Sequence, residues 1–264
     1  MPSDSMGKTL GVAAGVCVVC SIFVSTAAVY LKPRQDANKR FDKRKNVLLA
    51  ADLIEQGERP STEKVDELFG QLDKLWIDFE DKKFIDEQDV PADCLDERKL
   101  PDDPNKQIKV DPKAKFAGMN KRARYRQIYL NKDGDKIATV ILPVHGKGLW
   151  STMYGFLALD GDMKTVKSMA FYEHGETPGL GGEVDSKNWK ASWVNKIAFD
   201  ETGKPQIKVV KGIAAVGAKD EVNGLSGATL TANGVQILVR DWLGDNGYGP
   251  FLKKLNEEEE KQDG

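Results

Sequence analysis

The chain begins with a long apolar segment. Residues 9–31 carry no charged side chain, and at about 1.5 Å per residue a helix of that length crosses the hydrocarbon core of a bilayer. A cleaved signal peptide is the alternative, because Ser25-Thr26-Ala27-Ala28 imitates a cleavage site. The apolar region of a signal peptide is usually about 7–15 residues long, so the pattern favours a retained membrane anchor.

Amphipathic helices are predicted after this anchor. Lys32-Pro33 is expected to end the span, residues 34–56 repeat with a helical period, and Gly57 is expected to stop that helix. Pro60-Ser61 then starts a second helix, whose apolar residues recur every three or four positions, as on one core-facing helix face. These residues are Val65, Leu68, Phe69, Leu72, Leu75, Trp76 and Phe79.

Residues 80–113 have a different character. The segment is charged and contains several prolines, so we expect a surface insertion or a long loop.

From about residue 123 the pattern becomes typical of strands and tight turns. Three hairpins are expected, with strands at 125–130 and 137–142, at 154–159 and 165–172, and at 197–199 and 206–210. A short helix is expected at 186–195. A longer one is expected at 229–243, with Ala232, Val235, Leu238, Val239 and Trp242 on one face. Strands followed by helices indicate an α+β fold with an antiparallel sheet, preceded by a single transmembrane helix.

Composition excludes several kinds of protein. The net charge of −2 gives no electrostatic reason to expect nucleic-acid binding. Three cysteines exclude a disulfide framework, and Cys17 and Cys20, inside the apolar run, are expected to be small buried side chains of a helix rather than metal ligands. With two histidines in the chain, a His-rich metal site is excluded, and we expect no metal site.

The most informative motif is Ser226-Gly227-Ala228-Thr229. It comes directly before the predicted helix at 229–243 and offers a threonine hydroxyl at a helix N-terminus. Backbone N–H groups and the helix dipole favour a phosphate there. A turn that leads into a helix cap is the plainer alternative for so short a motif.

Three further segments are rich in glycine. Residues 144–155 include Leu149 and Trp150, where glycines allow close backbone approach and the indole offers a flat face. Residues 174–182 contain a tight Pro178-Gly179 turn and open backbone N–H groups. A hairpin connection and a surface turn are the respective alternatives. Residues 241–252 are interpreted as packing or a partner contact.

In their order, these motifs resemble the family formed by the C subunits of Na⁺-translocating NADH:quinone oxidoreductases. The resemblance covers most of residues 7–255 and rests on the anchor followed by G-x-G-L-W-S, H-x-E-T-P-G-L-G, S-G-A-T-x-T and W-L-G-D-N-G-Y-G-P-F-L. The last motif separates this family from the similar G subunit of the Rnf ferredoxin:NAD⁺ complex, which shares the middle motifs.

The resemblance implies FMN covalently bound to Thr229 through a phosphoester, transferred from FAD by a flavin transferase. It implies that the flavin is surrounded by Ser226, Gly227, Ala228, Leu149, Trp150, Glu176, Thr177, Gly179 and Leu180. Glu176 and Thr177 are expected to bond polar groups of its ring or ribityl chain. No catalytic acid–base pair is required, because the flavin supplies the redox chemistry.

The family also implies a place in a larger assembly. The chain would relay electrons from a membrane iron centre to a second FMN on the B subunit of a Na⁺-pumping NADH:ubiquinone reductase, with the A, B, D, E and F subunits as partners. The expected parts are a tail (1–8), a transmembrane helix (9–31), amphipathic helices (32–79), a charged loop (80–113), an FMN-binding domain (114–255) and an acidic tail (256–264).

The expected topology is single-pass in the bacterial inner membrane, with the soluble domain on the periplasmic side. Basic residues after the span oppose this under the positive-inside rule, but a long exported domain and partner subunits can override the charge count. The alternatives are an Rnf-type or free-standing membrane-anchored FMN carrier, and a non-redox membrane-anchored assembly or binding protein.

Overall fold

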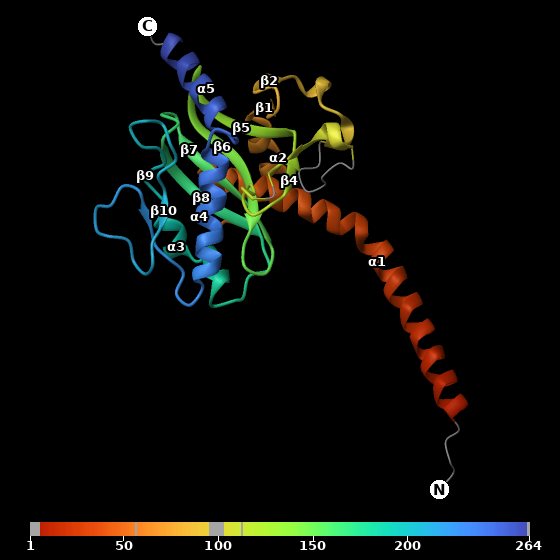
Figure 1. Ribbon diagram of the computed structural model, residues 1–264. Helices are drawn as coiled ribbons and strands as arrows, with labels where there is room; N and C mark the ends of the chain where they lie inside the picture. The colour runs from red at the N-terminus through yellow and green to blue at the C-terminus, as the bar shows by residue number, and fades with distance from the viewer. Residues whose placement is uncertain (1–5, 56, 95–102, 112, 263–264) are drawn as a thin grey trace. The chain divides into compact units, whose positions relative to one another are not determined.

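The computed structural model describes residues 6–55, 57–94, 103–111 and 113–262. The chain divides into two compact units, Met1–Lys43 and Arg44–Gly264. Figure 1 shows the sheet and helices of the second unit, which holds the glycine-rich segments.

The first helix is longer than expected. Helix α1 spans Met6–Ala50 and continues through Pro33, so the prediction of a break at Lys32-Pro33 and a separate helix over 34–56 is wrong. Proline removes one backbone donor and favours a kink, but a long helix can continue through it. The helix also stops well before Gly57, and Asp52, just beyond its end, has a positive φ of 62°. An 18-residue stretch of α1 is apolar enough to cross a membrane, and Cys17 and Cys20 are exposed on it rather than buried.

The second helix is shorter than expected. Helix α2 spans Thr62–Gly70, and the Ser61 hydroxyl caps it by accepting from the Lys64 amide at 3.3 Å. The predicted continuation to Phe79 is wrong, because Asp73–Asp78 forms strand β1. Trp76 and Ile77 belong to different hydrophobic clusters, as alternating positions of a strand do. Pairing with a longer strand satisfies this backbone and outweighs the helical spacing of the apolar residues.

In the described part of the chain, seven strands form one antiparallel sheet in the order β2-β1-β5-β6-β7-β8-β9. Besides β1, the strands are β2 (Lys83–Ile85), β5 (Tyr125–Asp133), β6 (Lys136–Lys147), β7 (Thr152–Asp160), β8 (Thr165–Glu173) and β9 (Lys196–Ile197). The first two predicted hairpins are therefore confirmed, and so is the α+β class with an antiparallel sheet.

The third predicted hairpin is confirmed only in part. Phe199 and Pro205 form a single bridge around its turn. Strand β10 (Lys208–Val209) instead pairs in parallel with β11 (Glu221–Val222). A further small ladder joins β3 (Gln107–Lys109) to β4 (Lys121–Ala123).

Short helices complete the connections. The expected helix near 186–195 is present as α3 (Lys187–Ala191), with Trp189 buried. The 3₁₀ turns among the described residues are η1 (Glu87–Asp89), η2 (Ala92–Cys94), η3 (Pro104–Lys106) and η4 (Gly181–Asp185). The segment expected to be a loop at 80–113 thus contains β2, β3 and three of these turns, while residues 95–102 and 112 lie outside the described residues.

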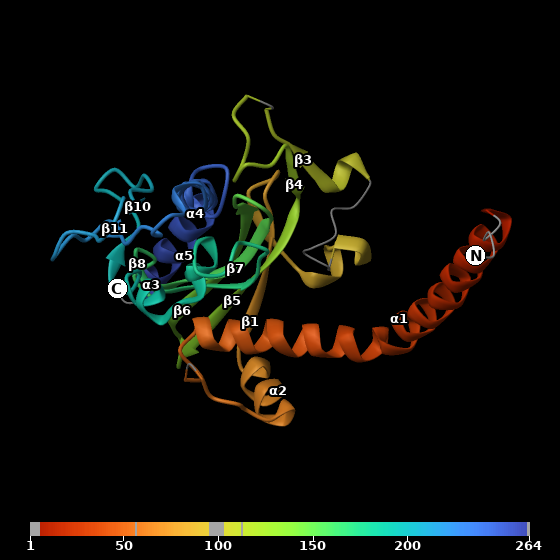
Figure 2. The ribbon, with the colours of Figure 1, turned by 90° about the horizontal axis from the view of Figure 1, so that it is seen from below.

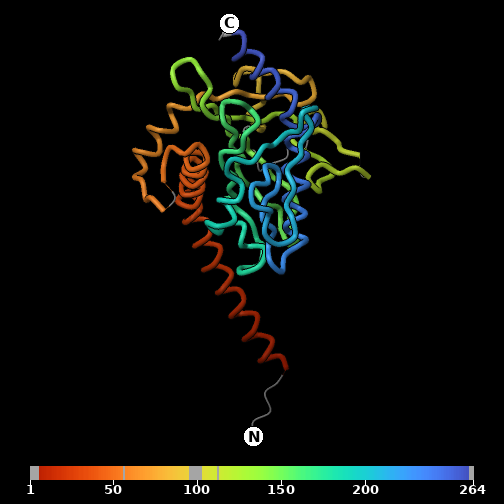
Figure 3. The backbone as a smooth tube through the Cα atoms, turned by 90° about the vertical axis from the view of Figure 1, so that its left-hand side faces the viewer, coloured from red at the N-terminus to blue at the C-terminus, as the bar shows by residue number. Residues whose placement is uncertain are grey.

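Helix α4 spans Thr229–Leu243, as predicted, and buries Ala232, Val235, Leu238, Val239 and Trp242. It packs on β6. Figure 2 and Figure 3 show α4 and α5 on one face of the sheet and α2 on the other. The core therefore has a helix layer against each face of the sheet.

The segment 241–252 packs inside the domain. Trp242 donates through Nε1 to the His145 carbonyl at 2.7 Å, and the Tyr248 hydroxyl donates to the Pro143 carbonyl at 2.6 Å. The two rings stack with centroids 5.1 Å apart. Helix α5 spans Gly249–Gln262, so the expected acidic tail is helical up to Gln262, and residues 263–264 lie outside the described residues.

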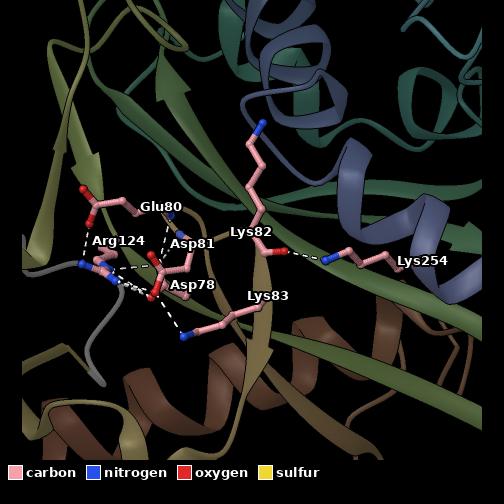
Figure 4. A network of polar contacts seen from close by, with 7 residues as sticks. All are labelled: Asp78, Glu80, Asp81, Lys82, Lys83, Arg124 and Lys254. Carbon is pink, nitrogen blue, oxygen red and sulfur yellow. Dashed lines mark hydrogen bonds and ion pairs between the residues drawn. The ribbon is translucent and has the colours of Figure 1, made fainter.

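A polar network joins the end of β1 to the residue between β4 and β5 (Figure 4). Arg124 donates through Nε and Nη2 to both carboxylate oxygens of Asp78, at 2.7–3.0 Å. Asp78 also accepts from the backbone amides of Glu80 at 3.0 Å and Asp81 at 3.2 Å. Arg124 pairs with the Glu80 and Asp81 carboxylates as well. Because Asp78 is buried, this network fixes the turn between β1 and β2.

Candidate functional site

Thr229 is the first residue of α4 and its side chain is exposed. The chain enters the helix through Gly227, whose φ of +70° is one that only glycine adopts without strain. Ala228 is the N-cap and makes no side-chain cap hydrogen bond. The first N–H groups of a helix have no partner within it, so the start of α4 offers a hydroxyl beside a partial positive charge.

The Leu149–Trp150 loop follows β6, and a buried carboxylate holds it. Glu176 accepts from the backbone amides of Leu149 at 3.1 Å, Trp150 at 3.0 Å and Ser151 at 3.2 Å. It also accepts from the Ser151 hydroxyl at 3.3 Å. The sequence suggested that Glu176 bonds a ligand, whereas in the structure both of its oxygens accept from the protein itself.

Thr231 connects the same carboxylate to α4. Its hydroxyl donates to Glu176 at 2.6 Å, and Thr231 is buried. Burial by itself raises the pKa of Glu176, but the hydrogen bonds from Thr231 and the loop amides outweigh it and lower the pKa. Glu176 is therefore an anion at neutral pH, tied to two separate elements.

The segment between β8 and η4 lies beside the start of α4. The Thr177 carbonyl accepts from the amides of Leu180 at 3.1 Å and Gly182 at 2.9 Å, and Gly179 has a φ of +76°. A Cβ placed on Gly227 would lie 2.9 Å from Cδ2 of Leu180. The predicted turn of this segment therefore contacts the predicted helix start.

Apolar side chains are exposed around this junction. Trp150 is 72% exposed, Leu230 62%, Leu149 44% and Leu180 43%. Exposed apolar residues that come together from three segments are typical of a binding surface. In Figure 1, α4 begins at its lower end, near the loops that follow β6 and β8.

A cavity of about 660 Å³ opens next to Thr229. This volume is within the range of small-molecule sites. Of the predicted residues, Ser226, Gly227 and Thr229 line it; Leu149, Trp150, Glu176, Thr177, Gly179, Leu180 and Ala228 do not. The lining also includes Lys211, Asn223 and Asn233.

Lys211, Asn223 and Asn233 could not be assigned to the site from the sequence. They lie in a loop after β10, just after β11, and on α4 respectively. A single lysine or asparagine carries no motif, so only the fold brings them to Thr229.

The sequence predicted no metal site. Among the described residues, no group of three or more His, Cys, Asp or Glu side chains could hold a metal ion.

Comparisons with known proteins agree on one kind of relative. The family model "FMN-binding domain" matches residues 148–244. The chain is 48% identical to the C subunit of the Na⁺-translocating NADH-quinone reductase of Vibrio vulnificus, over 97% of each chain. It is 43% identical to the protein of that name from Pseudomonas aeruginosa, over 97% of this chain and 98% of that one. A crystal structure of Shewanella oneidensis NqrC superposes with a TM-score of 0.74 at 33% identity, covering 84% of this chain and 99% of that chain.

Proposed function

The chain belongs to the family of C subunits of Na⁺-translocating NADH-quinone reductases, and we propose that it carries FMN on Thr229 through a phosphoester and relays electrons. The observation that carries the proposal is the position of Thr229, exposed at an uncapped helix N-terminus beside a cavity of about 660 Å³. The FMN-binding domain match includes this residue.

The residues present fit FMN. A phosphate ester on Thr229 would lie at the positive end of α4, with the Lys211 ammonium in the same cavity lining. The exposed apolar residues Trp150, Leu149 and Leu180 suit the ring system, and Thr177 offers a hydroxyl for its polar atoms. Ser226, Gly227 and Ala228 shape the turn that presents Thr229.

Attachment requires a transfer reaction. A flavin transferase would direct the Thr229 hydroxyl oxygen to the FMN phosphorus of FAD, forming the threonine–phosphate bond with loss of AMP and the hydroxyl proton. The exposed side chain of Thr229 suits this reaction, because the transferase must reach the oxygen on the protein surface. Bound FMN then supplies one- and two-electron redox chemistry, while the chain provides position and environment.

We propose that the chain accepts electrons from an iron centre at the membrane and passes them to a second FMN on the B subunit. Its other partners in the complex would be the A, D, E and F subunits. A covalent link suits a carrier whose site is open to solvent, because the cofactor cannot be lost by dissociation. The exposure of Trp150, Leu149 and Leu180 suits a flavin that stays accessible to a redox partner.

The proposal is tested by denaturing the protein after expression together with a flavin transferase. Flavin fluorescence should migrate with the polypeptide on a denaturing gel. Protein expressed without the transferase should show none. If flavin from the first sample is released on denaturation, the covalent link is refuted.

We also propose that the domain after α1 lies on the periplasmic side of the inner membrane. The basic residues after the apolar stretch favour the opposite side; they are Lys32, Arg34, Lys39, Arg40, Lys43, Arg44 and Lys45. The proposal rests on the family resemblance and on the length of the exported domain, which weakens the charge rule.

We predict that protease added outside right-side-out spheroplasts degrades the domain of the intact complex. A cytoplasmic protein serves as the control and should stay intact until the membrane is broken. A domain that is protected until lysis would contradict the periplasmic topology.

A further inference from the structure

Two threonines lie two residues apart at the start of α4, and the structure treats them differently. Thr229 is exposed, whereas Thr231 is 1% exposed and donates its hydroxyl to Glu176 at 2.6 Å. We propose that Thr231 is a positioning residue that acts through Glu176 to hold the Leu149–Trp150 loop at the flavin site. This inference rests on the proposed attachment of FMN at Thr229 and gives the second threonine of the motif its own role.

The contact forms a latch between two elements. Glu176 accepts hydrogen bonds from three consecutive amides of the loop. It also accepts one from the Thr231 hydroxyl, which links it to α4. The loop itself is closed by the Gly148 amide, which donates to the Ser151 carbonyl at 2.9 Å. The loop and the helix start therefore share one buried anion, and a charge-assisted hydrogen bond of this length is a strong one.

Two glycines bring the backbone close to the latch. A Cβ placed on Gly148 would lie 2.5 Å from Oε1 of Glu176, and a Cβ on Gly181 would lie 2.7 Å from Oγ1 of Thr231. Both glycines permit an approach that no larger residue would allow. A side chain at either glycine would collide with the Glu176 carboxylate or the Thr231 hydroxyl.

The latch has two consequences for the flavin site. It fixes the backbone beneath Trp150, whose side chain is 72% exposed. It also withdraws the Thr231 hydroxyl from solvent, so that of the two threonines Thr229 is the one presented to a transferase.

The test compares Thr231→Val with Thr231→Ser. Valine keeps the shape of threonine but removes the hydroxyl, while serine keeps the hydroxyl. Thr202→Val is a matched control, because Thr202 also donates its hydroxyl to a carboxylate, that of Asp200 at 2.7 Å, and does not line the cavity beside Thr229. Amide hydrogen exchange at residues 149–151 is measured without flavin, and the fluorescence of covalently bound flavin is measured after loading.

In Thr231→Val we expect exchange of the three loop amides to rise about tenfold or more, since a hydrogen bond to a charged group is lost. Loading at Thr229 should persist, and flavin fluorescence should increase because the indole of Trp150 is no longer held against the ring. Thr231→Ser and Thr202→Val should match the wild type in both measurements.

Unchanged exchange and unchanged fluorescence in a folded Thr231→Val protein would overturn the inference, as would equal changes in Thr202→Val. The exchange measurement needs no flavin, so it tests the latch even if the proposed function fails. Wild-type protein without covalent flavin would refute attachment at Thr229, whereas loaded wild type with an unaltered valine variant would refute only the latch.

Discussion

Thr229→Ala is expected to give folded protein that carries no covalent flavin. The substitution removes the only oxygen that the exposed side chain at the start of α4 can offer to a phosphorus atom. Its effect on folding should be small, because the side chain is exposed and the Ala228 N-cap makes no side-chain hydrogen bond. Flavin content is measured by fluorescence of the denatured polypeptide after expression with the transferase, and folding by circular dichroism.

Thr229→Ser provides the control for this result. Serine keeps a hydroxyl at the same position and should retain part of the loading. The nearby Thr231 should not replace Thr229 in the alanine variant, because its hydroxyl is buried and bonded to Glu176. Covalent flavin on Thr229→Ala, at any residue, would refute the assignment.

Asp78→Asn is expected to cause the largest loss of stability, about 3–5 kcal/mol. Asp78 is buried and takes hydrogen bonds from the Arg124 guanidinium and from two amides of the β1–β2 turn (Figure 4). Asparagine removes the charge that offsets the guanidinium and puts an NH₂ group where an acceptor is needed. The free energy of unfolding, measured by urea denaturation of the soluble domain, should fall without a change in the denaturant slope.

Two neighbours make matched controls. Glu80 and Asp81 also pair with Arg124, but their side chains are largely exposed. Exposed ion pairs contribute about 0–1 kcal/mol, so Glu80→Gln and Asp81→Asn should cost little. An Asp78→Asn protein as stable as these controls would show that the network does not hold the turn.

The same residue predicts a dependence of stability on pH. Burial by itself raises the pKa of Asp78, but the hydrogen bonds from Arg124 and the turn amides outweigh it and lower the pKa below the ordinary value. A lowered folded pKa contributes stability that is present above the unfolded pKa of about 3.9 and is lost as pH falls through the folded value. Unfolding profiles from pH 5 downward should therefore be less steep in Asp78→Asn than in the wild type.

The sequence predicted correctly those elements whose structure depends only on neighbouring residues. The hairpins around residues 131–135 and 160–162 follow from turn residues between alternating strands. Helix α4 begins and ends at the residues expected. These features need no knowledge of distant parts of the chain.

Other features depend on contacts that spacing does not encode. The apolar residues at 72–79 fit a helix face and a strand equally well, and only pairing with β5 decides between them. Pro33 is compatible with either a helix end or a continued helix. Glu176 was recognised as important, but its partners on α4 and in the Trp150 loop come from distant positions, so its hydrogen bonds within the protein could not be predicted.

In the candidate site, too, some features follow from local sequence and others from contacts between distant segments. The segments that contain Trp150, Glu176 and Thr229 contact one another in the structure. Lys211 and Asn223 line the cavity only because β10 and β11 pair in parallel and bring their flanking loops to the start of α4. The sequence thus contained the segments of the site, and the fold added the residues that enclose it.

The most direct test of the central claim is tandem mass spectrometry of the tryptic peptide 220–240 from protein expressed with the flavin transferase. This peptide contains both Thr229 and Thr231, and fragmentation between them separates the two sites. We predict a mass increase equal to FMN less one water, located on Thr229. An unmodified peptide, or flavin located on any other residue, would contradict the account.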